Sequence, residues 1–329
     1  MNLLETTYMG LHLKNPIIVG SSGLSFNIDN LINFEAAGAA AVVLKSIFEE
    51  EIHLEHSDFL SEDDPYNSRA EQLDYLDVNI RKEKLDKFTR LITKAKKYLS
   101  IPVIASINCS YSIEWVAFAK EFAKAGADAI ELNLFISPSD EKLSSTDIEE
   151  LYFKITSKVK QSVDIPVAVK ITNQFTSLYS VVKGLANSGA DGLVLFNRFF
   201  SPDFDIEKMV VKPSFVFSTE QEIAASLRWI GLLHNRINCD FCASTGIHDG
   251  EAVVKAILAG ASAIQITSVL YQHGFSSITA MIKFLEKWMM GKHYTSIVDF
   301  KGKLSYMSKE NPGVYERQQF MKYFGKNII

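Results

Sequence analysis

Two lysines in this 329-residue chain directly follow runs of apolar residues. Lys45 follows the run 40–44, and Lys170 follows the run 166–169. An ammonium group at the edge of an apolar core needs an anionic or electron-rich partner, because burying an unpaired charge is costly. Six further apolar runs also end in polar residues, namely Ser21 and Ser22, Ser106, Asn133, Asn197, Ser244 and Thr245, and Thr267 and Ser268. Together, these polar ends favour a ligand site over ordinary solvated turns.

The last two of these runs end in residues suited to binding phosphate. One continues into Thr245-Gly246-Ile247 and the other into Thr267-Ser268. Glycine and small hydroxyl residues leave backbone N–H groups open to an anion, and the N-terminus of a following helix adds to the attraction. The two turns therefore predict a phosphate cradle. The alternative is that Gly246 is only a turn residue.

A short pattern that recurs four times indicates how these residues are positioned. Its copies are residues 37–44, 125–132, 188–195 and 259–266, each opening with a small residue, a glycine and an alanine. Each copy follows an amphipathic helical stretch and leads into an apolar strand. Glycine supplies the left-handed residue that ends a helix. A repeated helix–glycine–strand unit predicts a parallel sheet with helices on its outside.

The whole chain contains eight such candidate strands. They cover residues 16–21, 40–47, 102–107, 129–134, 166–171, 192–197, 239–244 and 262–267. Eight strand–helix units predict an α/β fold, a closed TIM (β/α)8 barrel, whose function gathers at the carboxyl ends of the strands. The connections after the second and sixth strands are long, residues 48–80 and 198–218, and we expect both to lie over the barrel mouth. A helix over 82–98 follows the first of them. No linker divides the chain, so one domain over 1–329 is predicted.

Composition argues against several classes of protein. A net charge of −5 leaves no broad basic surface for nucleic acid or an anionic membrane. We find no signal peptide and no run that approaches the roughly 20 apolar residues of a membrane helix. Three cysteines fit a reducing compartment better than a disulfide framework. We therefore expect a cytoplasmic protein with a small-molecule substrate and without nucleic-acid or membrane partners. The sequence leaves open whether the protein forms a homodimer.

Several segments resemble the dihydroorotate dehydrogenase family of FMN-binding barrels. They are GLHLKNPI at 10–17, SG at 22–23, VLKS at 43–46, ELNL at 131–134, VAVKI at 167–171, TGI at 245–247, LAGA at 258–261 and QITS at 265–268. The resemblance covers nearly the whole chain. It implies non-covalently bound FMN and an oxidoreductase that acts on a CH–CH group of a small, pyrimidine-like substrate by hydride transfer to flavin N5.

The same resemblance implies roles for individual residues. The implied FMN-binding residues are Ser22, Gly23, Lys45, Ser46, Asn133, Lys170, Gly246, Thr267 and Ser268. Lys170 would lie against the polar edge of the flavin ring, and the last three residues would take the phosphate. The implied substrate-binding residues are Asn133, Asn197 and Arg198. A guanidinium suits bidentate recognition of a carboxylate. The alternative for Arg198 is a surface ion pair with Asp203 or Asp205.

The segment after the fourth strand departs from the family. The family has Asn-x-Ser-Cys-Pro-Asn there, with the Cys or a Ser as catalytic base, whereas this chain reads NLFISPSD at 133–140. Alignment on Pro138 makes Ser137 the candidate base, and Lys45 is a second catalytic candidate. A serine hydroxyl is a poor base without help from a neighbour. An acidic stretch, 48–56, also replaces the family's substrate segment after the second strand. We therefore expect a divergent branch that keeps FMN and turns over dihydroorotate weakly.

A repurposed flavin-binding barrel, acting as a sensor or partner subunit, is the alternative to an enzyme. The missing cysteine after the fourth strand favours this alternative, whereas Lys45 and Lys170 favour an enzyme. An RNA-modifying FMN barrel of the tRNA dihydrouridine synthase type would need a basic face, which the net charge opposes.

Two clusters that could suggest metal or redox chemistry have simpler interpretations. His53 and His56 stand beside acidic residues but without a zinc motif, so we interpret them as part of a solvated lid and predict no metal. Cys239 and Cys242 are three apart on a predicted strand, where side chains point to opposite faces. Two buried, unpaired thiols are expected there.

Overall fold

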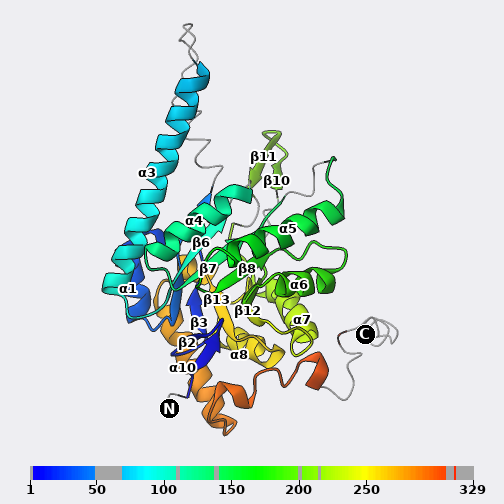
Figure 1. The fold of residues 1–329 in the computed structure, drawn as a ribbon. Coiled ribbons are helices and arrows are strands. Elements are labelled where there is room, and N and C mark those ends of the chain that lie inside the picture. Colours follow the sequence, from blue (N-terminus) through cyan, green and yellow to red (C-terminus); the bar gives the residue numbers. More distant parts are fainter. Residues whose placement is uncertain are drawn as a thin grey trace.

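Eight parallel strands close into a ring in the computed structural model (Figure 1). The structure describes residues 3–48, 69–108, 112–136, 141–198, 202–213, 216–308 and 315, with the backbone alone at 69–81 and 112–114. The ring strands are β3 (Ile17–Val19), β4 (Ala41–Val43), β6 (Val103–Asn108), β7 (Ala129–Asn133), β8 (Val167–Ile171), β9 (Gly192–Leu195), β12 (Asp240–Ser244) and β13 (Ala263–Ile266). β3 pairs with both β13 and β4, and β4 pairs with β6, which closes the ring. The predicted TIM barrel is confirmed.

Helices surround this ring (Figure 1). They are α1 (Ile28–Ala36), α3 (Arg69–Tyr98), α4 (Ser112–Lys124), α5 (Ser145–Lys160), α6 (Leu178–Asn187), α7 (Ile223–Leu233), α8 (Gly250–Ala259), the short α9 (Ser268–His273) and α10 (Ser276–Gly291). Single 3-10 turns occur at η1 (Gly23–Phe26), η2 (Glu220–Glu222), η3 (Ile297–Asp299) and η4 (Tyr306–Ser308). The helices bury one apolar face against the strands, as Leu31 and Phe34 of α1 illustrate.

The repeated glycine performs the role that the pattern predicts. Gly38, Gly126, Gly189 and Gly260 have φ angles of +108°, +98°, +99° and +124°. After each of them, the next residue donates its N–H to a carbonyl five residues back, as in Ala39 N–H to Phe34 O at 3.0 Å. A left-handed residue followed by this bond is the usual way to end a helix and release the chain into a strand. The repeat therefore sets the barrel's helix-to-strand turns.

An N-terminal hairpin that the sequence did not reveal closes one end of the barrel. Its strands are β1 (Thr6–Tyr8) and β2 (Leu11–Leu13), which pair antiparallel. Tyr8, Met9 and Leu13 are buried against the first residues of several ring strands, among them Ala129 and Ala263. This apolar plug fills the amino-terminal end of the barrel, so chemistry is left to the carboxyl-terminal end.

Both predicted long loops contain regular structure. Helix α3 begins at Arg69, so the expectation of a loop up to residue 80 and a helix only from 82 is wrong. The connection after the sixth ring strand carries an antiparallel hairpin, β10 (Pro202–Asp205) with β11 (Val210–Pro213). A further two-residue strand, β5 (Ile47–Phe48), pairs with β6 beyond the end of β4. The start of α3 and the β10–β11 hairpin stand beyond the barrel on the same side (Figure 1).

The chain after α10 returns to the barrel surface. The N–H groups of Gly302 and Leu304 donate to the carbonyls of Ile257 and Leu258 at the end of α8, both at 2.9 Å. This contact locates the first part of the tail that the sequence left unplaced. Among the described residues, no helix has the length and apolar character needed to cross a membrane.

Candidate functional site

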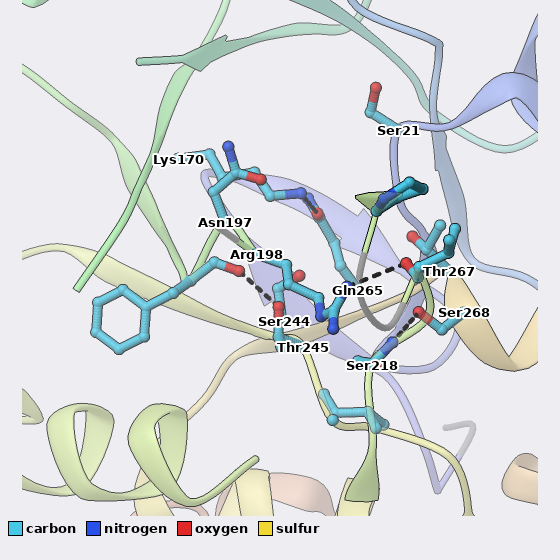
Figure 2. A pocket seen from close by; sticks show the side chains of 15 residues that line it. Ser21, Lys170, Asn197, Arg198, Ser218, Ser244, Thr245, Gln265, Thr267 and Ser268 are labelled. Carbon is cyan, nitrogen blue, oxygen red and sulfur yellow. Dashed lines mark hydrogen bonds between the residues drawn. The ribbon is translucent and has the colours of Figure 1, made fainter. Parts of the chain in front are cut away.

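A cavity of about 410 Å³ lies at the carboxyl ends of the ring strands (Figure 2). Its volume falls in the range of roughly 300–1,000 Å³ that is usual for small-molecule sites. It is lined by Ser21, Lys170, Phe196, Asn197, Arg198, Pro213, Val216, Ser218, Ser244, Thr245, Gly246, Ile247, Gln265, Thr267 and Ser268. Six predicted site residues, Lys170, Asn197, Arg198, Gly246, Thr267 and Ser268, therefore line one cavity.

Lys170 reaches this cavity from a buried network. Its Nζ donates to Gln265 Oε1 at 3.0 Å, and the two side chains meet in Figure 2. Gln265 Nε2 in turn donates to Glu131 Oε2. Glu131 Oε1 lies 3.8 Å from Lys170 Nζ, and both side chains are at most 9% exposed. Three strands thus hold one ammonium group at the floor of the cavity.

The turn after β12 has an unusual backbone. Thr245 and Gly246 have φ angles of +74° and +77°, and Thr245 Oγ1 donates to Phe196 O at 2.9 Å. A Cβ at Gly246 would lie 2.1 Å from the backbone nitrogen of Ile223, so only glycine fits. A left-handed threonine costs on the order of 1–3 kcal/mol, and such strain gathers at functional sites.

Backbone donors at this turn and the next remain available to a ligand. In the described part of the chain, no backbone hydrogen bond of a turn or loop uses the N–H of Gly246, Ile247 or Ser268. Ser268 is also the first residue of α9, where helix N–H groups have no internal partner. These donors lie where the sequence predicts a phosphate cradle.

The connection that carries the β10–β11 hairpin is tied to the same turns. Ser218 donates its N–H to Ser268 Oγ at 3.0 Å, and its hydroxyl lies 3.0 Å from His248 Nε2. Arg198 Nε donates to Glu222 Oε1 at 2.9 Å, and a second guanidinium nitrogen donates to Val216 O at 3.0 Å. The expected partners for an Arg198 ion pair were wrong, since its acidic partner is Glu222.

Asp203 and Asp205 have other contacts that explain this difference. Asp203 lies 3.4 Å from Lys212 across the hairpin, and Asp205 accepts backbone N–H groups in the hairpin turn. The hairpin therefore satisfies its own carboxylates, and Arg198 remains at the cavity wall.

Among the described residues, five predicted site residues do not line this cavity, and two of them, Asn133 and Ser46, hydrogen-bond to residues that do. Asn133 Oδ1 accepts a hydrogen bond from Asn197 Nδ2 at 2.8 Å. Ser46 donates its N–H to Ser21 Oγ at 2.9 Å, and its hydroxyl lies 2.7 Å from Ser106 Oγ. The Nζ of Lys45 lies 5.8 Å from the centre of the Phe26 ring.

Ser22 and Gly23 follow Ser21 at the end of β3. The hydroxyl of Ser22 is buried, and no hydrogen-bond partner for it is found among the described residues. A Cβ at Gly23 would lie 3.2 Å from the Tyr271 hydroxyl. A buried hydroxyl without a partner is costly, so this end of β3 is suited to a polar ligand.

Most of the chain matches a known protein family. The model described as Dihydroorotate dehydrogenase matches residues 74–289. This chain belongs to the dihydroorotate dehydrogenase family. It is 28% identical over 313 residues to a Thermoplasma acidophilum protein named dihydroorotate dehydrogenase B (NAD(+)), catalytic subunit. The aligned residues cover 91% of this chain and 98% of that protein. Proteins of the same name from Bacillus thuringiensis and Bacillus cereus are each 25% identical over 275 residues, 81% of this chain and 85% of theirs.

Dihydroorotate dehydrogenases typically bind FMN, and the residues of this cavity fit that group. FMN has an anionic phosphate, for which the turns after β12 and β13 offer N–H donors that no described turn or loop uses. Its ring has a polar edge, for which Lys170 offers a buried cation. The buried Ser22 hydroxyl, for which the described residues offer no partner, provides one more polar contact.

Some predictions for this dihydroorotate dehydrogenase family member fall outside the described residues. These include the candidate base Ser137, and His53 and His56 with their acidic neighbours. No group of three metal-binding side chains is found where the structure is described. Cys239 and Cys242 are both free, as expected, but only Cys242 is fully buried, whereas Cys239 is half-buried. Burial raises the pKa of the Cys239 thiol to about 12 and that of the Cys242 thiol well above its usual value, which disfavours the reactive thiolate form of both.

Two residues of the network were missed although the sequence contained a signal for them. Glu131 is two residues before Asn133, and Gln265 is two residues before Thr267. Positions two apart on a strand share a face, so each could have been assigned to the barrel interior with its polar neighbour. Ser218 and His248 carried no such signal, because they come from separate connections.

Proposed function

We propose that this chain is an FMN-dependent oxidoreductase that acts on the CH–CH group of a small, pyrimidine-like substrate. The observation that carries the proposal is Lys170, a buried ammonium group at the floor of a cavity whose other wall offers free backbone N–H donors. FMN, when bound, supplies N5 as the hydride acceptor. Family membership supports the same reaction class.

The residues of the chain would divide the binding of FMN among them. The N–H groups at Gly246 and Ser268, with the hydroxyls of Thr267 and Ser268, would bind the phosphate. Ser22 and Gly23 would line the ring. Lys170 would stabilise negative charge at the N1/O2 edge of the reduced flavin, and such preorganised contacts are commonly worth a few kcal/mol.

The substrate would bind beside the Asn133–Asn197 pair. Their mutual hydrogen bond uses Asn197 Nδ2 and Asn133 Oδ1. It leaves an amide NH₂ on Asn133 and a carbonyl oxygen on Asn197, which match the alternating C=O and N–H groups of a pyrimidine ring. Arg198 would bind an anionic substituent, and Ser137 or Lys45 would move the proton.

Electrons would leave through a second protein. The relatives are named catalytic subunits of an NAD⁺-dependent enzyme. By analogy, we infer that this chain carries the substrate half of the reaction and that a partner subunit passes the electrons to NAD⁺.

The test starts from the purified chain. Denaturation should release FMN, identified by mass, in about equal amount to protein. Anaerobic addition of dihydropyrimidines should then bleach the flavin absorbance near its visible maximum with at least one compound. No flavin, or FAD, would refute the cofactor. Bound FMN that dithionite bleaches but no dihydropyrimidine does would favour the sensor or partner-subunit alternative.

A further inference from the structure

Glu131 is a buried carboxylate that the proposed reaction does not use. It lies on β7 in the barrel interior, and the residue is 1% exposed. One of its oxygens accepts from Gln265, and the other, Oε1, is buried without a hydrogen-bond partner among the described residues. A buried carboxylate persists only where a positive charge or several donors compensate for its lost hydration.

The orientation of Gln265 follows from its two neighbours. An ammonium group can only donate, so Gln265 must turn its carbonyl oxygen toward Lys170. Its NH₂ then faces Glu131, which accepts as a carboxylate. The amide therefore separates the two charges and keeps Lys170 Nζ 3.8 Å from Glu131 Oε1 instead of in direct hydrogen-bond contact.

The other titratable groups that face Glu131 do not compete with it. Tyr8 lies in the plug, and Cys242 lies on β12, three strands away from β7 around the ring. Burial, with the Glu131 charge adding to it, raises the pKa of the Tyr8 hydroxyl well above its usual value. Burial likewise raises the pKa of the Cys242 thiol, although Lys170 acts in the opposite sense. Both groups stay neutral, so the charges that meet here are those of Glu131 and Lys170.

We infer that Glu131 is the counter-charge of Lys170 and that Gln265 is the spacer between them, so that together they set how much positive charge reaches the flavin. The inference rests on the proposed function, because it takes Lys170 to contact the flavin. Glu131 and Gln265 are positioning residues, since they act through Lys170. The network would then lower the flavin's reduction potential below the value that an uncompensated lysine would give.

The test measures the midpoint potential of the FMN-loaded protein. Glu131→Gln keeps the side-chain size and an acceptor for Gln265 but removes the negative charge. It should shift the two-electron equilibrium at least tenfold toward reduced flavin, which corresponds to about 30 mV in the positive direction. Glu121→Gln is the matched control, because it removes the same charge from the surface of α4, where Glu121 pairs with Lys124.

A second variant should move the potential in the opposite direction. Gln265→Met removes the spacer without changing the charge, so Lys170 can close onto Glu131 and withdraw from the cavity. The potential should then fall, as it should in Lys170→Met. A merely structural role would not give opposite signs for Glu131→Gln and Gln265→Met.

Each outcome decides. Both variants could bind flavin with two-electron equilibria that stay within twofold of the wild-type value, or that shift in the same direction. Either result would overturn the inference and leave the proposed function standing. A wild-type protein without any flavin would overturn both. If Glu131→Gln does not fold, the direction of the Gln265→Met shift decides alone, and a rise or no change refutes the inference.

Discussion

At the scale of single residues, both the steric room and the backbone conformation at position 246 require glycine. Its φ of +77° disfavours any L side chain, and the backbone of Ile223 occupies the place of a Cβ. Gly10 has nearly the same φ, +78°, but no atom lies within 4 Å of its Cβ position. Substitution of Gly10 would therefore cause backbone strain alone, whereas substitution of Gly246 would cause strain and a steric clash.

Gly246→Ala should lower the free energy of unfolding by about 3 kcal/mol or more, since both strain and overpacking act. It should also weaken FMN binding at least tenfold, because the start of α7 must shift at the cavity wall. Gly10→Ala should cost only about 1 kcal/mol and leave FMN binding unchanged. Urea denaturation and flavin titration measure both. Equal losses in the two variants would contradict the steric explanation.

At the scale of elements, Arg198 links the connection after β9 to the start of α7. Burial of Glu222 acts to raise its pKa, but hydrogen bonds from Thr219 N–H and from Arg198 outweigh it and lower the pKa below the usual value. A lowered carboxyl pKa means that the ion pair is present at neutral pH and is lost only as the pH falls through the lowered value. Arg198 is therefore held at the cavity wall under ordinary conditions.

Two variants separate this structural contact from substrate binding. Arg198→Ala should raise the substrate KM about tenfold to a hundredfold, because a charge-assisted hydrogen bond is worth about 1.5–3 kcal/mol. Glu222→Gln breaks the ion pair but keeps the guanidinium, so KM should stay within about threefold. Steady-state kinetics with an anionic dihydropyrimidine measures both. Similar KM values in the two variants would mean that Arg198 only anchors the connection.

The elements that could be predicted from the sequence are those that bury an apolar face. The helix–glycine–strand repeat identified the ring strands, because a buried parallel strand and a glycine-ended helix both leave strong patterns. The β10–β11 hairpin has no such pattern in its sequence. Phe204, Met209 and Val211 are exposed, and its turn uses Met209 at a φ of +52° instead of a glycine. The early part of α3 extends beyond the barrel (Figure 1), and the helical spacing of Leu73, Leu76 and Ile80 was a signal for it that the prediction did not use.

The residues of the candidate site could likewise be predicted only in part. Lys170 stood out because a charge after an apolar run is unusual. The contacts between Ser218, His248 and Ser268 depend on how two connections fold over each other. No spacing in the sequence encodes that, whereas the strand period could have supplied Glu131 and Gln265.

At the scale of the whole molecule, the barrel interior has an apolar plug at one end and a polar network at the other. Tyr8 lies in the plug, and its hydroxyl is buried without a hydrogen-bond partner among the described residues. Tyr152 has an equally buried side chain, but its hydroxyl donates to Leu134 O and accepts from Ile136 N–H.

Tyr8→Phe should therefore leave stability unchanged or raise the free energy of unfolding by about 1 kcal/mol, because it removes an unsatisfied polar group. Tyr152→Phe is the matched control and should lower that free energy by about 1 kcal/mol, since it removes a satisfied hydrogen bond. Chemical denaturation at neutral pH measures both. A loss in Tyr8→Phe as large as in Tyr152→Phe would indicate a partner for the Tyr8 hydroxyl.

The proposed reaction needs flavin, bound substrate and a base together, and the base is predicted from the sequence alone. In the segment NLFISPSD at 133–140, Ser137 is the candidate base that the family resemblance implies, in place of the expected cysteine. A well-placed general base contributes about 10²–10⁴-fold, so dihydroorotate should bleach the flavin at least about 100-fold more slowly than in a family member with the cysteine. Dithionite should still bleach it fully.

Stopped-flow absorbance of the FMN-loaded protein measures the rate of this bleaching. Ser137→Cys should accelerate it, because a thiol is partly ionised near neutral pH whereas a serine hydroxyl is not. Ser139→Ala should change it less than twofold as a neighbouring control. Rapid bleaching by dihydroorotate that Ser137→Ala abolishes would refute the expectation. It would mean that Ser137 reaches the reacting carbon and that this chain performs the family's own reaction with an activated serine.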